Sequence, residues 1–142
     1  AFMVATTVKA VLAQRLARRI CSECKIETEA SPTDVAVFKA HAVTIPKDAK
    51  FYKGKREGCG ACKGSGYKGR CAIHELMILD DEIKALIIKE AATDPLRRLA
   101  VERGMRSLIQ DGLEKVLIGM TTVREVLGGA EEKVDDAAEK KK

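Results

Sequence analysis

The sequence predicts an α/β fold, best described as an α+β fragment that ends in a small helical C-terminal bundle. Three observations lead to this prediction. Alternating apolar residues, typical of strands, lie on both sides of a cysteine-rich segment. Two C-x-x-C pairs occur within that segment, and capped, amphipathic helical patterns fill the chain after residue 80. The 142 residues are 46% hydrophobic, which disfavours extensive disorder.

The first twenty residues predict a helix that leads into a short strand. Val4, Val8, Val11 and Leu12 share one face of a helix, because they follow the spacing i, i+4, i+7, i+8. From Gln14 the pattern alternates, so a short strand is expected to reach Cys21. The chain begins at once in this core-like pattern, and we therefore expect it to be an excised piece of a longer protein.

Four of the five cysteines predict a metal site. Cys21 and Cys24 form one C-x-x-C pair, and Cys59 and Cys62 form a second, so two tight turns can direct four sulfurs at one ion. Structural Zn²⁺ is the favoured occupant, while a rubredoxin-like iron site and a redox dithiol remain alternatives. Disulfides are a weaker interpretation because the sequence shows no export signal. The fifth, Cys71, is expected to be a small buried core residue.

Glycines and cations surround these cysteines. Six of the eleven glycines lie between Gly54 and Gly69, where they allow backbone N–H groups to turn toward the sulfurs. The net charge of +5 arises largely in the segments that hold the cysteines. We expect a cationic collar that stabilises the thiolates, and a bound Zn²⁺ with four thiolates would lower the net charge to about +3.

The segment between the two cysteine pairs predicts a helix and a strand. Ser31 and Pro32 have the preferences of an N-cap and a first helical residue, and the apolar residues Val35, Val37 and Phe38 follow, with the helix ending before Pro46. Phe51-Tyr52 predicts a short strand.

After the second cysteine pair, a longer strand is expected from Gly69, with alternate residues on one of its faces: Cys71, Ile73, Glu75 and Met77.

Four helices are expected after this strand. The first is capped by Asp80, and the second opens at Asp94-Pro95 and closes at Gly104. Two capping-box spacings start the third and fourth helices. These spacings are Ser107 with Gln110, and Thr122 with Glu125. Residues 129–142 predict a solvated, disordered tail.

The sequence shows no catalytic apparatus of its own. It contains neither the G-x-x-x-x-G-K-[ST] phosphate loop nor a dinucleotide-binding G-x-G-x-x-G motif. His41 and His74 are the only histidines, and neither has a positioned partner in the pattern. Nucleic-acid binding is disfavoured because tryptophan is absent and only 4% of residues are aromatic. No apolar run is long enough to span a membrane.

Several motifs together resemble the type II secretion and type IV pilus assembly ATPases. The opening Phe2-Met-Val-Ala-Thr-Thr through Ile20-Cys-Ser-Glu-Cys24 looks like the segment that leaves that family's nucleotide-binding core. The knuckle Cys59-Gly-Ala-Cys-Lys-Gly-Ser-Gly-Tyr-Lys-Gly-Arg70 and the following Ile-His-Glu-Leu resemble its second cysteine pair and next strand. Gly-Met-Arg-Ser-Leu-Ile-Gln-Asp-Gly-Leu113 and Thr-Thr-Val-Arg-Glu-Val-Leu127 are similar to its helical C-terminus.

The resemblance implies an organisation and a function for a longer parent protein. Residues 1–20 would be the last helix and strand of a RecA-like ATPase core, 21–68 the tetracysteine zinc module, and 69–128 a core strand with the helical C-terminal subdomain. The parent would be a homo-hexamer that binds ATP and Mg²⁺. It would be cytoplasmic, and it would lie at the inner membrane through assembly proteins of the secretion or pilus machine. By this resemblance Cys21, Cys24, Cys59 and Cys62 hold the zinc, and no catalytic residue is carried over.

Two further interpretations come from other classes of protein. Cys59 to Gly66 spells C-x-x-C-x-G-x-G, as in the zinc module of Hsp40 co-chaperones, but that family repeats the motif four times and the first cysteine pair here lacks the glycines. A nucleic-acid-binding zinc ribbon is the other alternative, and it would require a strongly salt-dependent affinity.

Overall fold

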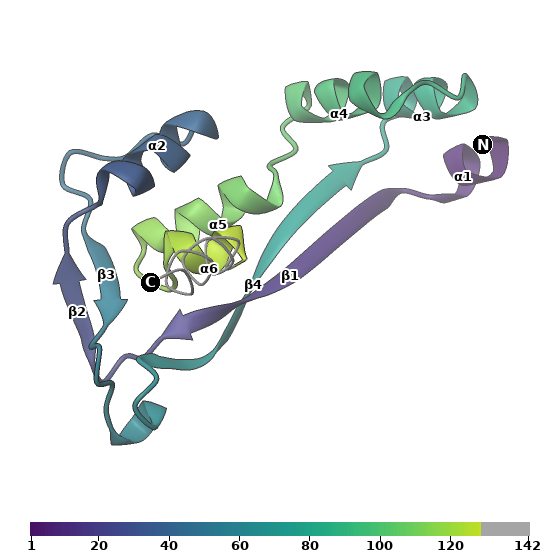
Figure 1. Ribbon diagram of the computed structural model, residues 1–142. Helices are drawn as coiled ribbons and strands as arrows, with labels where there is room; N and C mark the ends of the chain where they lie inside the picture. The colour runs from purple at the N-terminus through teal and green to yellow at the C-terminus, as the bar shows by residue number, and fades with distance from the viewer. Residues whose placement is uncertain (129–142) are drawn as a thin grey trace, which may run out of the picture. The chain divides into compact units, whose positions relative to one another are not determined.

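The computed structural model describes residues 1–128, and the tail predicted over 129–142 lies outside the described residues. Within residues 1–128 the chain is mixed α/β, with six α-helices, one 3₁₀ turn and two two-stranded sheets (Figure 1). The elements in chain order are α1 Phe2–Thr7, β1 Ala10–Ile20, β2 Lys25–Thr28, α2 Pro32–Ala40, β3 Phe51–Gly54, η1 Gly60–Cys62, β4 Tyr67–Ile78, α3 Asp81–Ile88, α4 Thr93–Glu102, α5 Leu108–Leu117 and α6 Val123–Leu127. None of these helices has the length and apolar character needed to cross a bilayer.

The described chain forms two compact units. Among the described residues, the first unit contains residues 1–14 and 74–108, and the second contains residues 15–73 and 109–128. One sheet pairs β1 with β4, and the other pairs β2 with β3 in antiparallel register. Strands β1 and β4 therefore each contribute residues to both units, whereas the β2–β3 sheet belongs entirely to the second.

The N-terminal helix is shorter than the sequence predicts. Helix α1 ends at Thr7, and Val8 already has an extended backbone with ψ 131°. The prediction that Val11 and Leu12 lie on a helical face is wrong, because both belong to strand β1. The strand starts at Ala10 rather than Gln14 because pairing with β4 satisfies the backbone there, and the Lys9 carbonyl accepts the Leu79 N–H at 2.9 Å.

Helices α3 and α4 form the core of the first unit. The Asp80 carboxylate accepts the Ile83 N–H at 2.9 Å, which confirms the predicted N-cap. Helix α4 begins at Thr93, slightly before the predicted Asp94-Pro95 start, and Gly104 follows its end with φ +94°. Three buried side chains are packed at the centre of this unit: Leu79, Ile83 and Ala100.

The segment between the cysteine pairs contains one strand that the sequence analysis missed. Helix α2 has the predicted Ser31 cap, and its Asp34 side chain completes a capping box. Strand β3 confirms the predicted strand at Phe51, but β2, which pairs with it, was not expected. Lys25–Thr28 carries no clear alternation, so only the pairing with β3 identifies it as a strand.

The core of the second unit joins this segment to the C-terminal helices. The rings of Phe38 on α2 and Phe51 on β3 meet edge to face, with centroids 5.7 Å apart. The same cluster includes buried residues of α5 and α6: Leu113, Val116, Val123 and Val126. Burial of these apolar side chains ties residues of α2 and β3 to helices more than fifty positions later in the chain.

Helix α6 is fixed by a cap and by an ion pair. The Thr122 hydroxyl accepts the Glu125 N–H, as the predicted capping box requires. The Glu125 carboxylate, however, accepts hydrogen bonds from the Arg18 backbone N–H at 3.1 Å and its guanidinium at 2.6 Å. Burial raises the pKa of Glu125, but the contacts with Arg18 outweigh it and the net pKa is lowered. Strand β1 is thereby tied to α6.

Gly112 on α5 gives the first testable prediction. A Cβ atom at this position would lie 2.5 Å from Cγ1 of the fully buried Val126. Gly112→Ala should therefore lower the free energy of unfolding by about 1–3 kcal/mol, although alanine is the better helix former by about 1 kcal/mol. Denaturant unfolding of the variant measures this change.

The double variant Gly112→Ala/Val126→Ala provides the control. Removing the γ-methyl groups removes the steric conflict, so the double variant should lose less stability than the sum of the two single variants. The steric explanation would be contradicted if the double variant lost as much stability as the two single variants together. It would also be contradicted if Gly112→Ala alone made the chain more stable.

Candidate metal centre

The first cysteine pair lies at the turn that connects the two sheets. Cys21 follows directly after β1, and its backbone N–H donates to the Gly66 carbonyl at 3.0 Å. Cys24 lies directly before β2, and its carbonyl accepts the Lys55 N–H at 3.0 Å. Backbone hydrogen bonds from both cysteines therefore connect this turn to the second cysteine pair.

The second cysteine pair is held by a 3₁₀ turn. Cys59 precedes η1 and Cys62 is its last residue. The Cys59 carbonyl accepts the N–H groups of Cys62 at 3.2 Å and of Gly64 at 3.1 Å, while Lys63 is left-handed with φ 52°. A turn of this kind points two side chains separated by two residues toward the same point.

The four sulfurs lie at tetrahedral spacing. All four Sγ atoms are within 4.8 Å of one another. The Sγ–Sγ distances are 3.8 Å for Cys21–Cys59, 3.8 Å for Cys24–Cys62 and 3.7 Å for Cys59–Cys62. A tetrahedron of thiolates about 2.3 Å from a central ion has edges of about 3.8 Å. The cysteines are free of disulfides, and their donor set and spacing fit a metal ion.

Backbone donors stabilise the thiolate form of Cys62. Its Sγ accepts the Cys59 N–H at 3.1 Å and the Gly66 N–H at 3.3 Å, which confirms that glycine positions an N–H group at a sulfur. Burial raises the pKa of Cys62, but these two hydrogen bonds, together with those from the Cys59 and Cys24 thiols, outweigh it and lower the pKa to about 6. Burial is the main cause that raises the pKa of Cys24 to about 12.

Two glycine–glycine contacts bring the second pair into position. A Cβ on Gly54 would lie 2.3 Å from the Gly66 carbonyl oxygen. A Cβ on Gly58, whose φ is +60°, would lie 2.4 Å from the Gly64 carbonyl carbon. The sequence indicates that glycines matter here but does not reveal these contacts, because their partners become known only when the two segments meet.

The cationic collar does not touch the sulfurs. Six exposed lysines and arginines, which we call the knuckle cations, lie between residues 53 and 70. They are Lys53, Lys55, Arg56, Lys63, Lys68 and Arg70. In the described part of the chain, none of these six side chains donates a hydrogen bond to a cysteine sulfur. The nitrogen donors to the Cys62 sulfur are the backbone N–H groups of Cys59 and Gly66. Any support that they give the thiolates is long-range electrostatics.

The other candidate residues lie outside the cluster. Cys71 is buried in β4, as predicted, and burial is the main cause that raises its pKa. Over residues 1–128 the group of potential metal ligands consists of the four cysteines and includes neither His41 nor His74.

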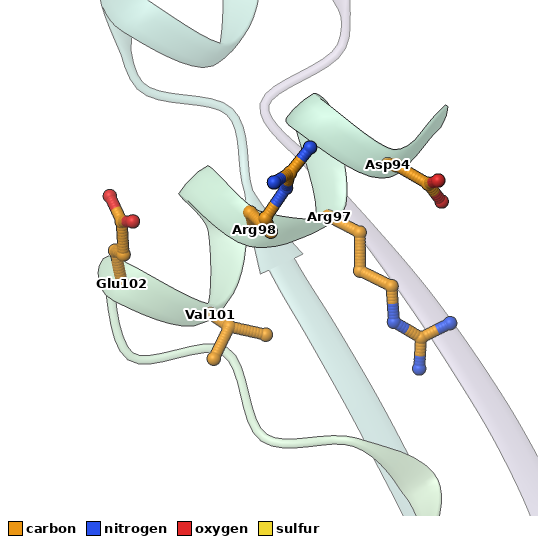
Figure 2. A pocket seen from close by; sticks show the side chains of 5 residues that line it. All are labelled: Asp94, Arg97, Arg98, Val101 and Glu102. Carbon is orange, nitrogen blue, oxygen red and sulfur yellow. The ribbon is translucent and has the colours of Figure 1, made fainter. Parts of the chain in front are cut away.

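A cavity of about 570 Å³ on α4 also lacks the features of a catalytic site. Its lining residues all belong to this one helix: Asp94, Arg97, Arg98, Val101 and Glu102. Figure 2 shows Arg97 and Arg98 pointing to different sides of the helix, so the two guanidinium groups do not converge on one ligand. The geometry of the described residues therefore indicates a metal centre and no second reactive site.

The class of protein follows from these features: a mixed α/β chain carrying a closed tetracysteine module. Its sequence matches the family described as type II/IV secretion system protein over residues 1–128. The chain belongs to this family.

Curated relatives agree with this assignment. The chain is 41% identical over 126 residues to the type IV pilus assembly ATPase PilB of Thermus thermophilus, a match that covers 89% of this chain and 14% of the relative. It is 36% identical to the putative type II secretion system protein E of Escherichia coli, covering 89% of this chain and 24% of the relative. It is 39% identical to the type IV pilus assembly ATPase PilB of Myxococcus xanthus, and this match covers 89% of this chain and 22% of the relative. The chain thus spans between 14% and 24% of the length of these three relatives.

Proposed function

We propose that this chain is the zinc-bearing C-terminal part of an ATPase that powers type II secretion or type IV pilus assembly. The observation that carries the proposal is the close grouping of four cysteine sulfurs, all within 4.8 Å of one another, in a chain of this family. Cys21, Cys24, Cys59 and Cys62 would hold the ion, and all four positions would be filled by protein ligands. Such closed sites are structural rather than catalytic.

Zinc is the occupant that the donor set favours. Zn²⁺ prefers tetrahedral thiolate coordination and has no redox chemistry of its own, which suits a purely structural site. When bound, it supplies positive charge that holds all four thiols deprotonated. Its structural effect here would be to fasten the turn after β1 to the turn of η1, which come from segments about forty residues apart.

The catalytic work would belong to the rest of the parent protein. This chain contains no phosphate loop, so ATP and Mg²⁺ would be bound by upstream residues of a RecA-like core. We propose that residues 1–20 and 69–79 are the last elements of that core. In a cytoplasmic homo-hexamer, the chain would act in contacts between subunits and in docking to inner-membrane assembly proteins.

Metal analysis tests the structural part of this proposal. The chain purified without added metal should contain one zinc per molecule, and Co²⁺ substitution should give the visible absorption typical of tetrahedral thiolate coordination. A chain with no metal, or with one iron per molecule and the absorption of a ferric tetrathiolate, would contradict it.

An activity measurement tests the functional part. The isolated chain should hydrolyse no ATP above background, and the parent gene should encode a phosphate loop upstream of Ala1. ATP hydrolysis by the isolated chain, or a parent without a phosphate loop, would contradict the proposed role.

A further inference from the structure

The knuckle cations are the most highly charged exposed stretch of the described chain that the metal centre leaves unexplained. Six lysines and arginines lie between residues 53 and 70, while Glu57 is the only acidic residue in that stretch. All six are exposed. In the part of the chain that the structure describes, none of them forms an ion pair or a hydrogen bond through its side chain.

Backbone geometry explains the local fold without these side chains. The turn is held by backbone hydrogen bonds, such as those that the Cys59 carbonyl accepts, and by the contacts of Gly54 with Gly66 and of Gly58 with Gly64. The sulfurs of this turn take their hydrogen bonds from backbone N–H groups. In the described part of the chain, neither the local fold nor the metal centre therefore depends on a direct contact with the side chain of a knuckle cation.

The same glycine contacts bring together the backbone segments that carry three of these cations: Lys55, Arg56 and Lys63. Gly54 and Gly58 flank the stretch that holds Lys55 and Arg56. Their partners Gly66 and Gly64 both lie within three residues after Lys63. Two short cationic segments are therefore pressed against each other. Exposed like charges repel when they lie within the Debye length of about 8–10 Å, so an anionic partner gains by binding where such charges are close together.

Nucleic acid is a poor fit to this surface because no aromatic ring is free to stack on a base. The Tyr52 ring is covered by the Lys25 ammonium at 4.0 Å, and the Tyr67 ring is covered by the Arg18 guanidinium at 4.5 Å. Phe51 is buried. Single-stranded nucleic acids are usually bound by exposed aromatic rings together with cations, and here only the cations are exposed.

A membrane surface is also a poor fit. Residues 53–70 contain few apolar side chains. These are Tyr67, the small Ala61 and the two cysteines of the metal centre. Peripheral membrane segments combine basic residues with aromatic or aliphatic side chains that enter the lipid interface. An extended acidic stretch of protein needs neither stacking nor insertion, only complementary charge.

We propose that the knuckle cations form a docking surface for an acidic segment of a partner protein. The inference rests on the proposed function in one respect: it assumes that a bound metal holds the four-cysteine module rigid. Its partner would carry a run of aspartate and glutamate, and binding would be electrostatic, fast and weakened by salt.

The test uses the whole metal-loaded chain and a fluorescent synthetic peptide of interspersed aspartate, glutamate, serine and alanine. Fluorescence anisotropy should show binding that weakens as salt is raised. Lys55→Glu/Arg56→Glu/Lys63→Glu should weaken binding by about tenfold or more, because three attractive charges become repulsive. The matched control Lys47→Glu/Lys89→Glu/Arg98→Glu changes the net charge equally at exposed positions outside the surface, and it should bind the peptide several-fold more tightly than the first variant.

The remaining outcomes decide between partners. Single-stranded DNA or phosphatidylglycerol vesicles that bind more tightly than the peptide would overturn the assignment to an acidic protein segment. Equal weakening in both triple variants, or no binding of the peptide, would overturn the docking surface. Loss of the metal from the first triple variant alone would mean that the cations serve the metal centre, and would also overturn it. A wild-type chain without zinc would contradict the proposed function while leaving the peptide measurement interpretable.

Discussion

Cys62→Ala should release the metal and lower the melting temperature of the chain by at least about 10 °C. Structural zinc contributes about 10–16 kcal/mol of apparent binding free energy in zinc-finger peptides, so losing one of four ligands removes a large part of the module's stability. Cys62 is the ligand of choice for this test. It is buried, and two backbone N–H groups direct hydrogen bonds at its sulfur. Metal analysis and thermal unfolding measure the two effects.

Cys71→Ala is the matched control for this experiment. Cys71 is also a buried cysteine, with 6% of its surface exposed, but it lies outside the cluster. This variant should keep one metal ion and lose only about 1–2 kcal/mol from the missing sulfur contacts. A chelator should lower the melting temperature of the wild type toward that of Cys62→Ala and leave Cys62→Ala unchanged. Equal effects of the two substitutions would refute the metal centre.

The second large effect is expected at Gly58. Gly58→Ala places a Cβ 2.4 Å from the backbone of Gly64 and forces alanine to a φ of +60°. The left-handed conformation alone costs about 1–2 kcal/mol, and the collision is with backbone that cannot rotate away. We expect a total loss of about 3 kcal/mol or more in the free energy of unfolding, together with weaker metal binding. Denaturant unfolding and metal competition titrations measure both.

Two other glycines of the same segment separate the causes. Gly69 has φ +76° but its Cβ would meet nothing within 4 Å, so Gly69→Ala should show the conformational cost of about 1–2 kcal/mol alone. Gly60 has neither a positive φ nor a neighbour within 4 Å, so Gly60→Ala should change stability by less than about 0.5 kcal/mol. A different order of the three variants would show that the contact with Gly64 is not what constrains the turn.

Several parts of the fold could be predicted because they depend on neighbours in the sequence. The caps at Ser31, Asp80 and Thr122 follow from side chains that bond a backbone group three residues later. The C-x-x-C spacing likewise identifies the cysteines that the structure brings together. Family membership followed from motifs of the same local kind.

Other parts could not be predicted, because they depend on segments that meet only in the folded chain. Strand β2 is recognisable only through its pairing with β3, and the start of β1 at Ala10 depends on pairing with β4. The sequence placed Glu125 in a capping box, but its carboxylate binds Arg18, 107 positions away. Local propensity gives no information about such a partner.

The sequence by itself therefore determined the identity of the four cysteines, the helix caps at Ser31, Asp80 and Thr122, and the family. Each of these is encoded within a few consecutive residues, where sterics and short-range hydrogen bonds decide. Only the tertiary structure decided how the sulfurs reach tetrahedral spacing, why Gly54 and Gly58 must be glycine, and that the knuckle cations do not touch the sulfurs. The physical reason is that each of these depends on the distance between segments far apart in the chain, and long-range packing sets that distance.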